Sequence, residues 1–62
     1  MNLFDKIKLL AEKNNKSISK IEKEAGIANG TISGWKSSKP LAETLARVAK
    51  VLGTTVDELI NA

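Results

Sequence analysis

The sequence predicts an all-α fold, a compact bundle of five helices. Five segments repeat apolar residues at intervals of three and four, the helical period, and no segment alternates apolar and polar residues as a half-buried strand does. The chain has 62 residues and no cysteine. We therefore expect one small domain over residues 1–62, stabilised by packed helices and not by disulfides.

The first two expected helices each begin at a side chain that can cap backbone N–H groups. Asn2, with Asp5 three residues later, resembles an N-terminal cap for a helix that continues to about Asn14. Ser17 is a good N-cap for the second helix. Gly26 is expected to end the second helix, because a glycine readily adopts the left-handed conformation that closes a helix.

The third expected helix spans about residues 28–36 and carries two glycines. Ile32 and Trp35 fall on one face, which we expect in the core, and Gly30 and Gly34 fall on the opposite face. A glycine inside a helix costs about 1 kcal/mol relative to alanine. We therefore interpret this small, uncharged face as one that allows a partner to approach closely. The Asn-Gly pair is also typical of a simple turn or a frayed helix start, and this alternative stays open.

The fourth expected helix has the clearest amphipathic pattern of the chain, and Gly53 is expected to end it. Thr55 and Glu58 then form a capping box that opens a short fifth helix. The expected core collects apolar residues from all five helices: Leu3, Ile7, Leu10, Ile21, Ile32, Trp35, Leu45, Val48, Leu52 and Leu59.

Basic residues concentrate in the N-terminal two thirds of the chain. Residues 1–39 contain eight lysines against four acidic residues, whereas residues 40–62 contain two basic residues against three acidic ones. The net charge is +3 and the pI is near 9.5. This asymmetry favours a polyanionic partner, although we expect most of the lysines to be solvated helix surface.

The composition argues against an enzyme. The chain has neither cysteine nor histidine, so thiolate and imidazole metal sites are excluded and catalysis would need paired carboxylates or a lysine in a pocket. Glu22 and Glu24 are two residues apart on a helix and point away from each other. We expect no catalytic residue, no metal and no cofactor. No apolar run approaches the roughly 20 residues of a membrane span, so we expect a cytoplasmic protein without a membrane partner.

Two short helices joined by a glycine-containing turn are the arrangement of a helix-turn-helix. The stretch SISKIEKEAGIANGTISGWK resembles the two-helix motif of lambda-repressor-like domains, the Cro and phage-repressor type. The stretch ETLARVAKVLGTTVDEL resembles their closing pattern, and the whole is most similar to repressors of Gram-positive phages. The resemblance runs from Leu3 to Leu59.

This resemblance implies a transcriptional regulator that binds double-stranded DNA in a sequence-specific manner. It implies five helices around one core, with the third, about residues 29–36 here, in the major groove. It further implies a homodimer on a two-fold symmetric operator. It leaves open whether residues 1–62 are a whole repressor or the N-terminal domain of a longer one.

The resemblance also implies which residues meet DNA: Ser17, Asn29, Gly30, Thr31, Ser33, Gly34, Lys36, Ser37, Ser38 and Lys39. Asn29 would reach base edges at the start of the third helix, and Thr31 would contact a phosphate. Ser17 would head a second helix whose N-terminus faces a phosphate, and the serines and lysine at 37–39 would touch the DNA backbone.

Four positions depart from the family pattern, among them Ala28 and Ala42, which stand where serine or another capping residue is usual. Gly34 stands where a larger polar side chain usually reads bases, so we expect specificity to depend partly on DNA shape. Glu22 stands where many members have an alanine close to the third helix.

A second function stays open, in which the same fold is a protein interaction module for an antitoxin partner or an antirepressor. The salt dependence of DNA affinity separates the two readings, because neutralising phosphates makes binding salt-dependent.

Overall fold

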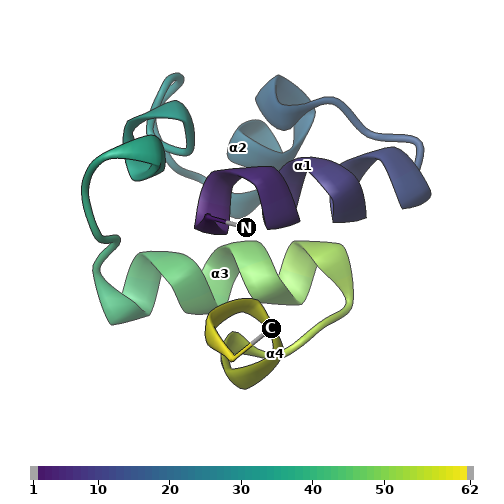
Figure 1. Ribbon diagram of the computed structural model, residues 1–62. Helices are drawn as coiled ribbons and strands as arrows, with labels where there is room; N and C mark the ends of the chain where they lie inside the picture. The colour runs from purple at the N-terminus through teal and green to yellow at the C-terminus, as the bar shows by residue number, and fades with distance from the viewer. Residues whose placement is uncertain (1, 62) are drawn as a thin grey trace.

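The computed structural model describes residues 2–61, and in this range it contains helices, turns and loops without a strand (Figure 1). The all-α prediction is confirmed. The elements, in chain order, are the α-helices α1 (Leu3–Lys13) and α2 (Ile18–Ala25), the 3-10 helix η1 (Ser33–Lys36), and the α-helices α3 (Ala42–Leu52) and α4 (Val56–Ile60). None of the described helices is both long and apolar enough to cross a membrane.

The predicted helix ends are confirmed at the caps. The side chains of Asn2, Ser17 and Thr55 each accept the backbone N–H three residues later, at 2.8, 3.1 and 3.1 Å. Gly26 and Gly53 end α2 and α3 in the left-handed conformation, with φ of 73° and 71°. These interactions lie within a few residues of chain, so the sequence alone specifies them.

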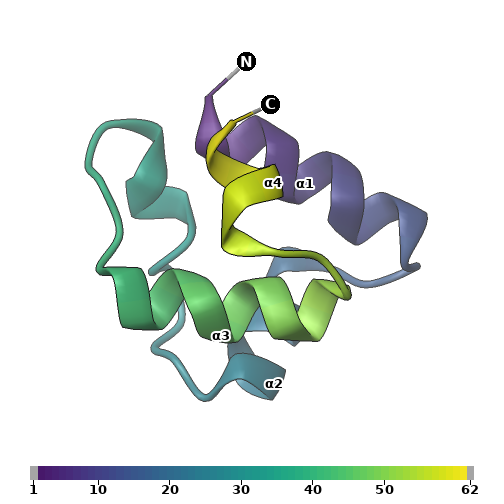
Figure 2. The same cartoon turned by 90° about the horizontal axis from the view of Figure 1, so that it is seen from below.

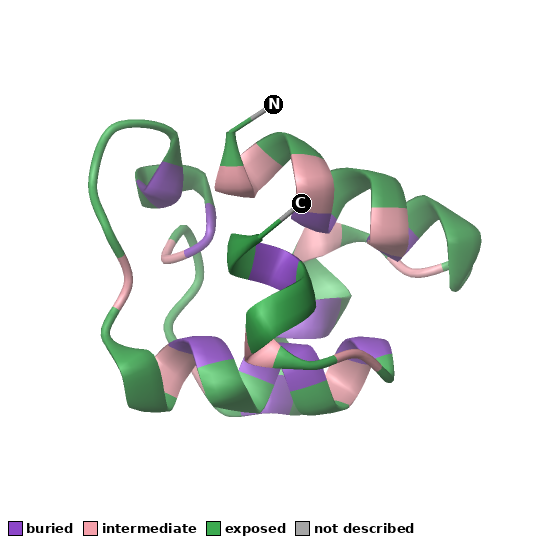
Figure 3. Ribbon diagram, turned by 60° about the horizontal axis from the view of Figure 1, so that its bottom comes forward, coloured by how far each residue is buried: buried purple, intermediate pink, exposed green. Residues whose placement is uncertain are grey.

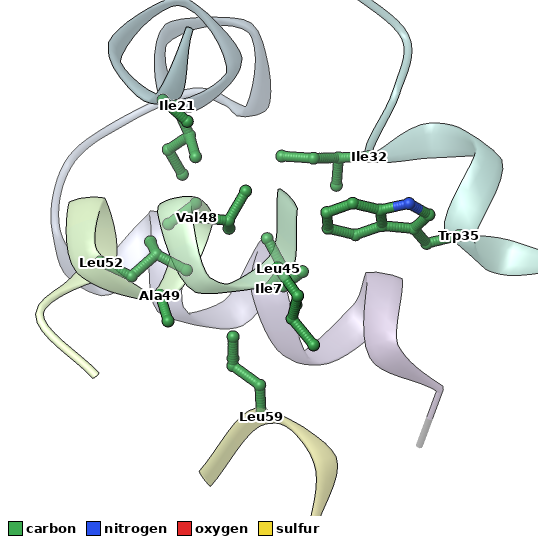
Figure 4. Close-up of a cluster of buried hydrophobic side chains, with 11 residues drawn as sticks. Ile7, Ile21, Ile32, Trp35, Leu45, Val48, Ala49, Leu52 and Leu59 are labelled. Atoms are coloured by element: carbon green, nitrogen blue, oxygen red, sulfur yellow. The ribbon is translucent and has the colours of Figure 1, made fainter. Parts of the chain in front are cut away.

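The core forms where the apolar faces of the helices meet. Ile32 and the Trp35 indole point into it toward residues of α3 (Figure 4). Leu3 and Leu10, which we expected inside, are half-buried at its edge, and alanines from three helices complete it. The buried apolar residues are Ile7, Ala11, Ile21, Ala25, Ile32, Trp35, Leu45, Val48, Ala49, Leu52 and Leu59.

The prediction of a third α-helix over residues 28–36 is wrong, so the described chain has four α-helices and one short 3-10 helix instead of five α-helices. Residues 29–32 form turns, and the Gly34 N–H donates to the carbonyls of both Gly30 and Thr31, each at 3.2 Å. The physical reason is composition, since asparagine, threonine and serine compete with the helix for backbone hydrogen bonds and glycine favours the unfolded chain.

The packing places η1 against α1, and α2 against α3. α4 lies against both α1 and α3, as the view from below shows (Figure 2). In Figure 1 the turns and η1 lie at the upper left, away from α4 at the bottom. Buried positions lie on the inner sides of the helices, whereas most of the chain from η1 to the start of α3 is exposed (Figure 3).

Candidate nucleic-acid interface

Residues 28–38, the turn segment, contain most of the predicted site residues. Two apolar side chains anchor this segment to the core, because Ile32 is fully buried and Trp35 is only 6% exposed. The core position predicted for Trp35 is confirmed. The predicted site residues that lie around the two anchors are at the surface: Asn29, Gly30, Ser33, Gly34, Lys36, Ser37 and Ser38 are exposed and Thr31 is half-buried.

A buried carboxylate of α2 holds the turn segment from its other side. Glu22 is 3% exposed, and both of its carboxylate oxygens lie 3.1 Å from the Gly30 backbone nitrogen. Its Oε2 also accepts the Ile32 N–H at 2.9 Å. These charge-assisted hydrogen bonds compensate for burying the carboxylate and link the two halves of the motif directly.

Sequence reasoning identified Glu22 as a departure from the family pattern and as a carboxylate that points away from Glu24, and it did not predict the contacts of Glu22. A signal was available, because Glu22 lies four residues after Ile18 and three before Ala25, on the apolar side of α2. A glutamate at such a position is either exposed by fraying or hydrogen-bonded inside. Glu22 is hydrogen-bonded inside, because the N–H groups of Gly30 and Ile32, eight and ten residues further along the chain, donate to it.

The two glycines of the turn segment have different roles. Gly30 has a φ of +91°, which L-residues rarely adopt, so this position needs glycine for its backbone and does not belong to a helical face. Gly34 has no such φ, and a Cβ placed on it would meet only the Ser38 hydroxyl, at 4.0 Å. The prediction that the two glycines share one helical face is therefore wrong for Gly30. Gly34 is exposed and carries no side chain, so the surface is smooth there.

Two hydroxyl groups of the site already donate hydrogen bonds within the protein. Thr31 Oγ1 donates to the Ala28 carbonyl at 2.7 Å, and Ser38 Oγ donates to the Gly34 carbonyl at 2.8 Å. Phosphate oxygens only accept hydrogen bonds in their ionised form, so a contact from either hydroxyl to a phosphate requires its rotation away from that carbonyl.

One lysine, Lys36, belongs to the turn segment, and a second, Lys39, directly follows it. The Lys36 ammonium lies 4.6 Å from the ring centroid of Phe4 on α1, a cation–π contact that leaves the charge unneutralised. Lys39 is exposed in the loop that leads to α3.

The start of α2 carries the remaining predicted site residue, Ser17. It is separate in the chain from the turn segment, and its hydroxyl is used as the cap of α2. Near it Lys16 pairs with Glu24 at 2.6 Å, and the hydrogen bond from Lys16, followed by the positive charges of Lys16 and Lys20, lowers the pKa of the Glu24 carboxyl. The positive charge at this end of α2 is therefore partly neutralised.

An apolar groove of about 450 Å³ lies between the start of α1, the start of α3 and α4, and Lys39, the residue that directly follows the turn segment, is among its lining residues. Leu3, Leu45 and Leu59 line it, and Ile60 at its edge is 62% exposed. Among residues 2–61 there is no group of three or more acidic side chains that could hold a metal ion.

The family comparison places this geometry in a known context. A family model described as helix-turn-helix matches residues 7–59, which include both α2 and the whole turn segment. A search of curated proteins and a search of solved structures each returned no significant match.

Proposed function

Since the chain belongs to the helix-turn-helix family, we propose that it binds a double-stranded DNA operator in a sequence-specific manner and acts as a transcriptional repressor of the phage type. The observation that supports the proposal is the turn segment itself. It is an exposed surface of small polar side chains, fixed to the core by Ile32 and Trp35 and to α2 by Glu22. Residues 29–34 of this segment carry no charged side chain, so this part of the surface can enter the major groove without burying an unpaired charge.

In this proposal residues 29–36 enter the major groove. Asn29 reads a base edge, since a carboxamide can pair with adenine through two hydrogen bonds. Gly34 lets the backbone approach closely because no side chain projects there. Lys39 contributes a phosphate contact that carries no sequence information.

The remaining predicted contacts belong to the same proposal. Ser33 meets base edges beside Gly34, while Lys36, Ser37 and Ser38 face the DNA backbone. The N-terminus of α2 at Ser17 faces a phosphate, because the free N–H groups of a helix start favour an anion.

The proposal also covers the oligomeric state of the protein, its compartment and its source. We expect a homodimer on a two-fold symmetric operator, with half-sites about 34–36 Å apart, one turn of DNA. The exposed Ile60 beside the apolar groove supplies a surface on which two copies can meet. We place the protein in the cytoplasm, as a repressor from a phage of Gram-positive bacteria, and treat residues 1–62 as its DNA-binding domain.

Selection from a random-sequence duplex library at fixed salt tests the proposal, followed by titration of the recovered duplex at several salt concentrations. Affinity should fall steeply as salt rises, because each neutralised phosphate releases counterions. Asn29→Ala should relax discrimination at one base pair by about 1–3 kcal/mol. Lys39→Ala should weaken binding to all sequences alike and reduce the salt slope by about one. Affinity that does not change with salt would contradict the proposal.

The alternative function, a protein interaction module, is favoured by one observation. The apolar groove with the exposed Ile60 is a surface that a partner helix can cover, and none of residues 28–38 is among its lining residues, although Lys39 at its edge directly follows the turn segment. Under this reading Ile60→Glu abolishes partner binding while any DNA binding is weak and insensitive to sequence. Under the main proposal Ile60→Glu lowers dimerisation and leaves the monomer able to bind a half-site.

A further inference from the structure

We propose that Glu22 is a positioning residue for DNA readout, which fixes the backbone on both sides of Thr31 and so sets how Asn29 meets the duplex. This inference rests on the proposed DNA-binding function. It extends that function to a residue that does not touch DNA, because the Glu22 side chain is almost fully buried.

The contacts of Glu22 show why the turn segment depends on it. Its carboxylate takes the N–H groups of Gly30 and Ile32 at 2.9–3.1 Å, whereas the N–H between them, of Thr31, bonds to the Ala28 carbonyl. In a regular helix these N–H groups would find carbonyls four residues earlier. Here the Glu22 carboxylate of α2 accepts these N–H groups in place of the helical carbonyls, so α2 fixes the backbone conformation of residues 29–32.

The ionised carboxylate is the acceptor that suits this arrangement. It accepts on both oxygens and carries no hydrogen that could clash with the Gly30 and Ile32 donors. Glutamine keeps the size of the side chain but turns an NH₂ group toward one of the two donors. Burial of Glu22 and of the Ile32 N–H prevents bulk water from replacing the lost acceptor.

Two possible roles of Glu22 predict opposite effects on DNA affinity when its charge is removed. If Glu22 acted only as a negative charge near a polyanion, its neutralisation would strengthen DNA binding. If it fixes the turn segment, neutralisation weakens binding to the recognised sequence, because Asn29 is no longer held in one place. Whether neutralising Glu22 raises or lowers the affinity for the recognised sequence therefore distinguishes the charge role from the positioning role.

The test compares Glu22→Gln with Glu12→Gln, which makes the same charge change at an exposed site on α1. Leu52→Ala serves as a stability control, since it removes a buried side chain of α3 without touching the turn segment. Each variant is titrated, well below its melting temperature, against the duplex that the wild-type chain recovers from a random library and against a scrambled duplex. Gly30 and Ile32 amide proton shifts are recorded on the free proteins.

We expect Glu22→Gln to weaken binding to the recovered duplex about tenfold, the effect of losing roughly one charge-assisted hydrogen bond. Binding to the scrambled duplex should stay level or become slightly tighter. Glu12→Gln and Leu52→Ala should keep the ratio of the two affinities. In the free protein, Glu22→Gln should move the Gly30 and Ile32 amide protons upfield together, because they no longer donate to a carboxylate.

Three results would overturn the inference. Unchanged amide shifts would refute the carboxylate contacts, and shifted amides with unchanged specificity would refute the positioning role. A wild-type chain that binds neither duplex in a salt-dependent way would refute the proposed function itself, and this inference with it. The first two results leave the proposed function intact.

Discussion

Replacing each glycine of the turn segment with alanine should change stability in opposite directions. Gly30 and Gly34 are four residues apart and both exposed, so sequence reasoning treats them alike. Gly30 has a φ of +91°, whereas Gly34 lies in η1 without a positive φ. An added Cβ would meet no atom within 4 Å at position 30 and only the Ser38 hydroxyl, at 4.0 Å, at position 34. An added Cβ is not crowded by other residues at either site, so the difference in stability between the two variants comes from the local backbone conformation.

The magnitudes follow from that difference. An L-residue held at a left-handed φ loses roughly 1–2 kcal/mol, because its Cβ approaches the following carbonyl oxygen. Gly30→Ala should therefore destabilise the chain by about 1–2 kcal/mol, although its N–H can still donate to Glu22. Gly34→Ala should stabilise it by about 0.5–1 kcal/mol, since alanine loses less backbone entropy on folding. For a domain of this size 1 kcal/mol corresponds to about 4–8 °C in Tm.

Thermal melts followed by circular dichroism measure both variants. We expect Tm to fall by about 4–16 °C for Gly30→Ala and to rise by about 2–8 °C for Gly34→Ala. A chemically synthesised chain with D-alanine at position 30 is the matched control, because a D-residue favours positive φ and should restore or exceed the wild-type Tm. If L-alanine at position 30 raised Tm, the left-handed turn and the account of the segment built on it would be refuted.

Other variants test the core, the surface and the charge pairing. Leu45→Ala should lower the free energy of unfolding by about 2–5 kcal/mol in urea titrations, because Leu45 is buried and its loss leaves a cavity; a smaller loss would place it outside the core. Gly34→Leu should keep the wild-type circular dichroism spectrum but weaken binding to the recovered duplex, and undiminished affinity would show that this face does not contact DNA. Since the pKa of Glu24 is lowered in the folded chain, its pairing with Lys16 stabilises the protein above the ordinary glutamate pKa and less as pH falls through the lowered value. In an NMR titration Lys16→Met should raise the pKa of Glu24, and an unchanged value would refute the pairing.

Most of the fold could be predicted from the sequence because its determinants are local or periodic. The caps at Asn2, Ser17 and Thr55 each use an N–H three residues away, so a short stretch of chain contains both partners. The apolar periods of α1, α2 and α3 identify the buried faces, and the core position of Trp35 follows from its sharing a face with Ile32. The sequence also predicted the helix-turn-helix family, which the match over residues 7–59 confirms.

The shape of the candidate site was decided by tertiary structure. Periodicity assigned residues 28–36 to a helix because Ile32 and Trp35 have helical spacing, yet their burial does not require helical hydrogen bonds around them. The sequence by itself determined that a glycine-bearing segment follows α2 and that two apolar side chains fix it to the core. Only the folded chain determined that Gly30 takes a left-handed turn and that Glu22 holds its N–H. The physical reason is that this hydrogen bond joins residues eight apart in separate elements, and the partners meet only after Gly26 has turned the chain back on α2.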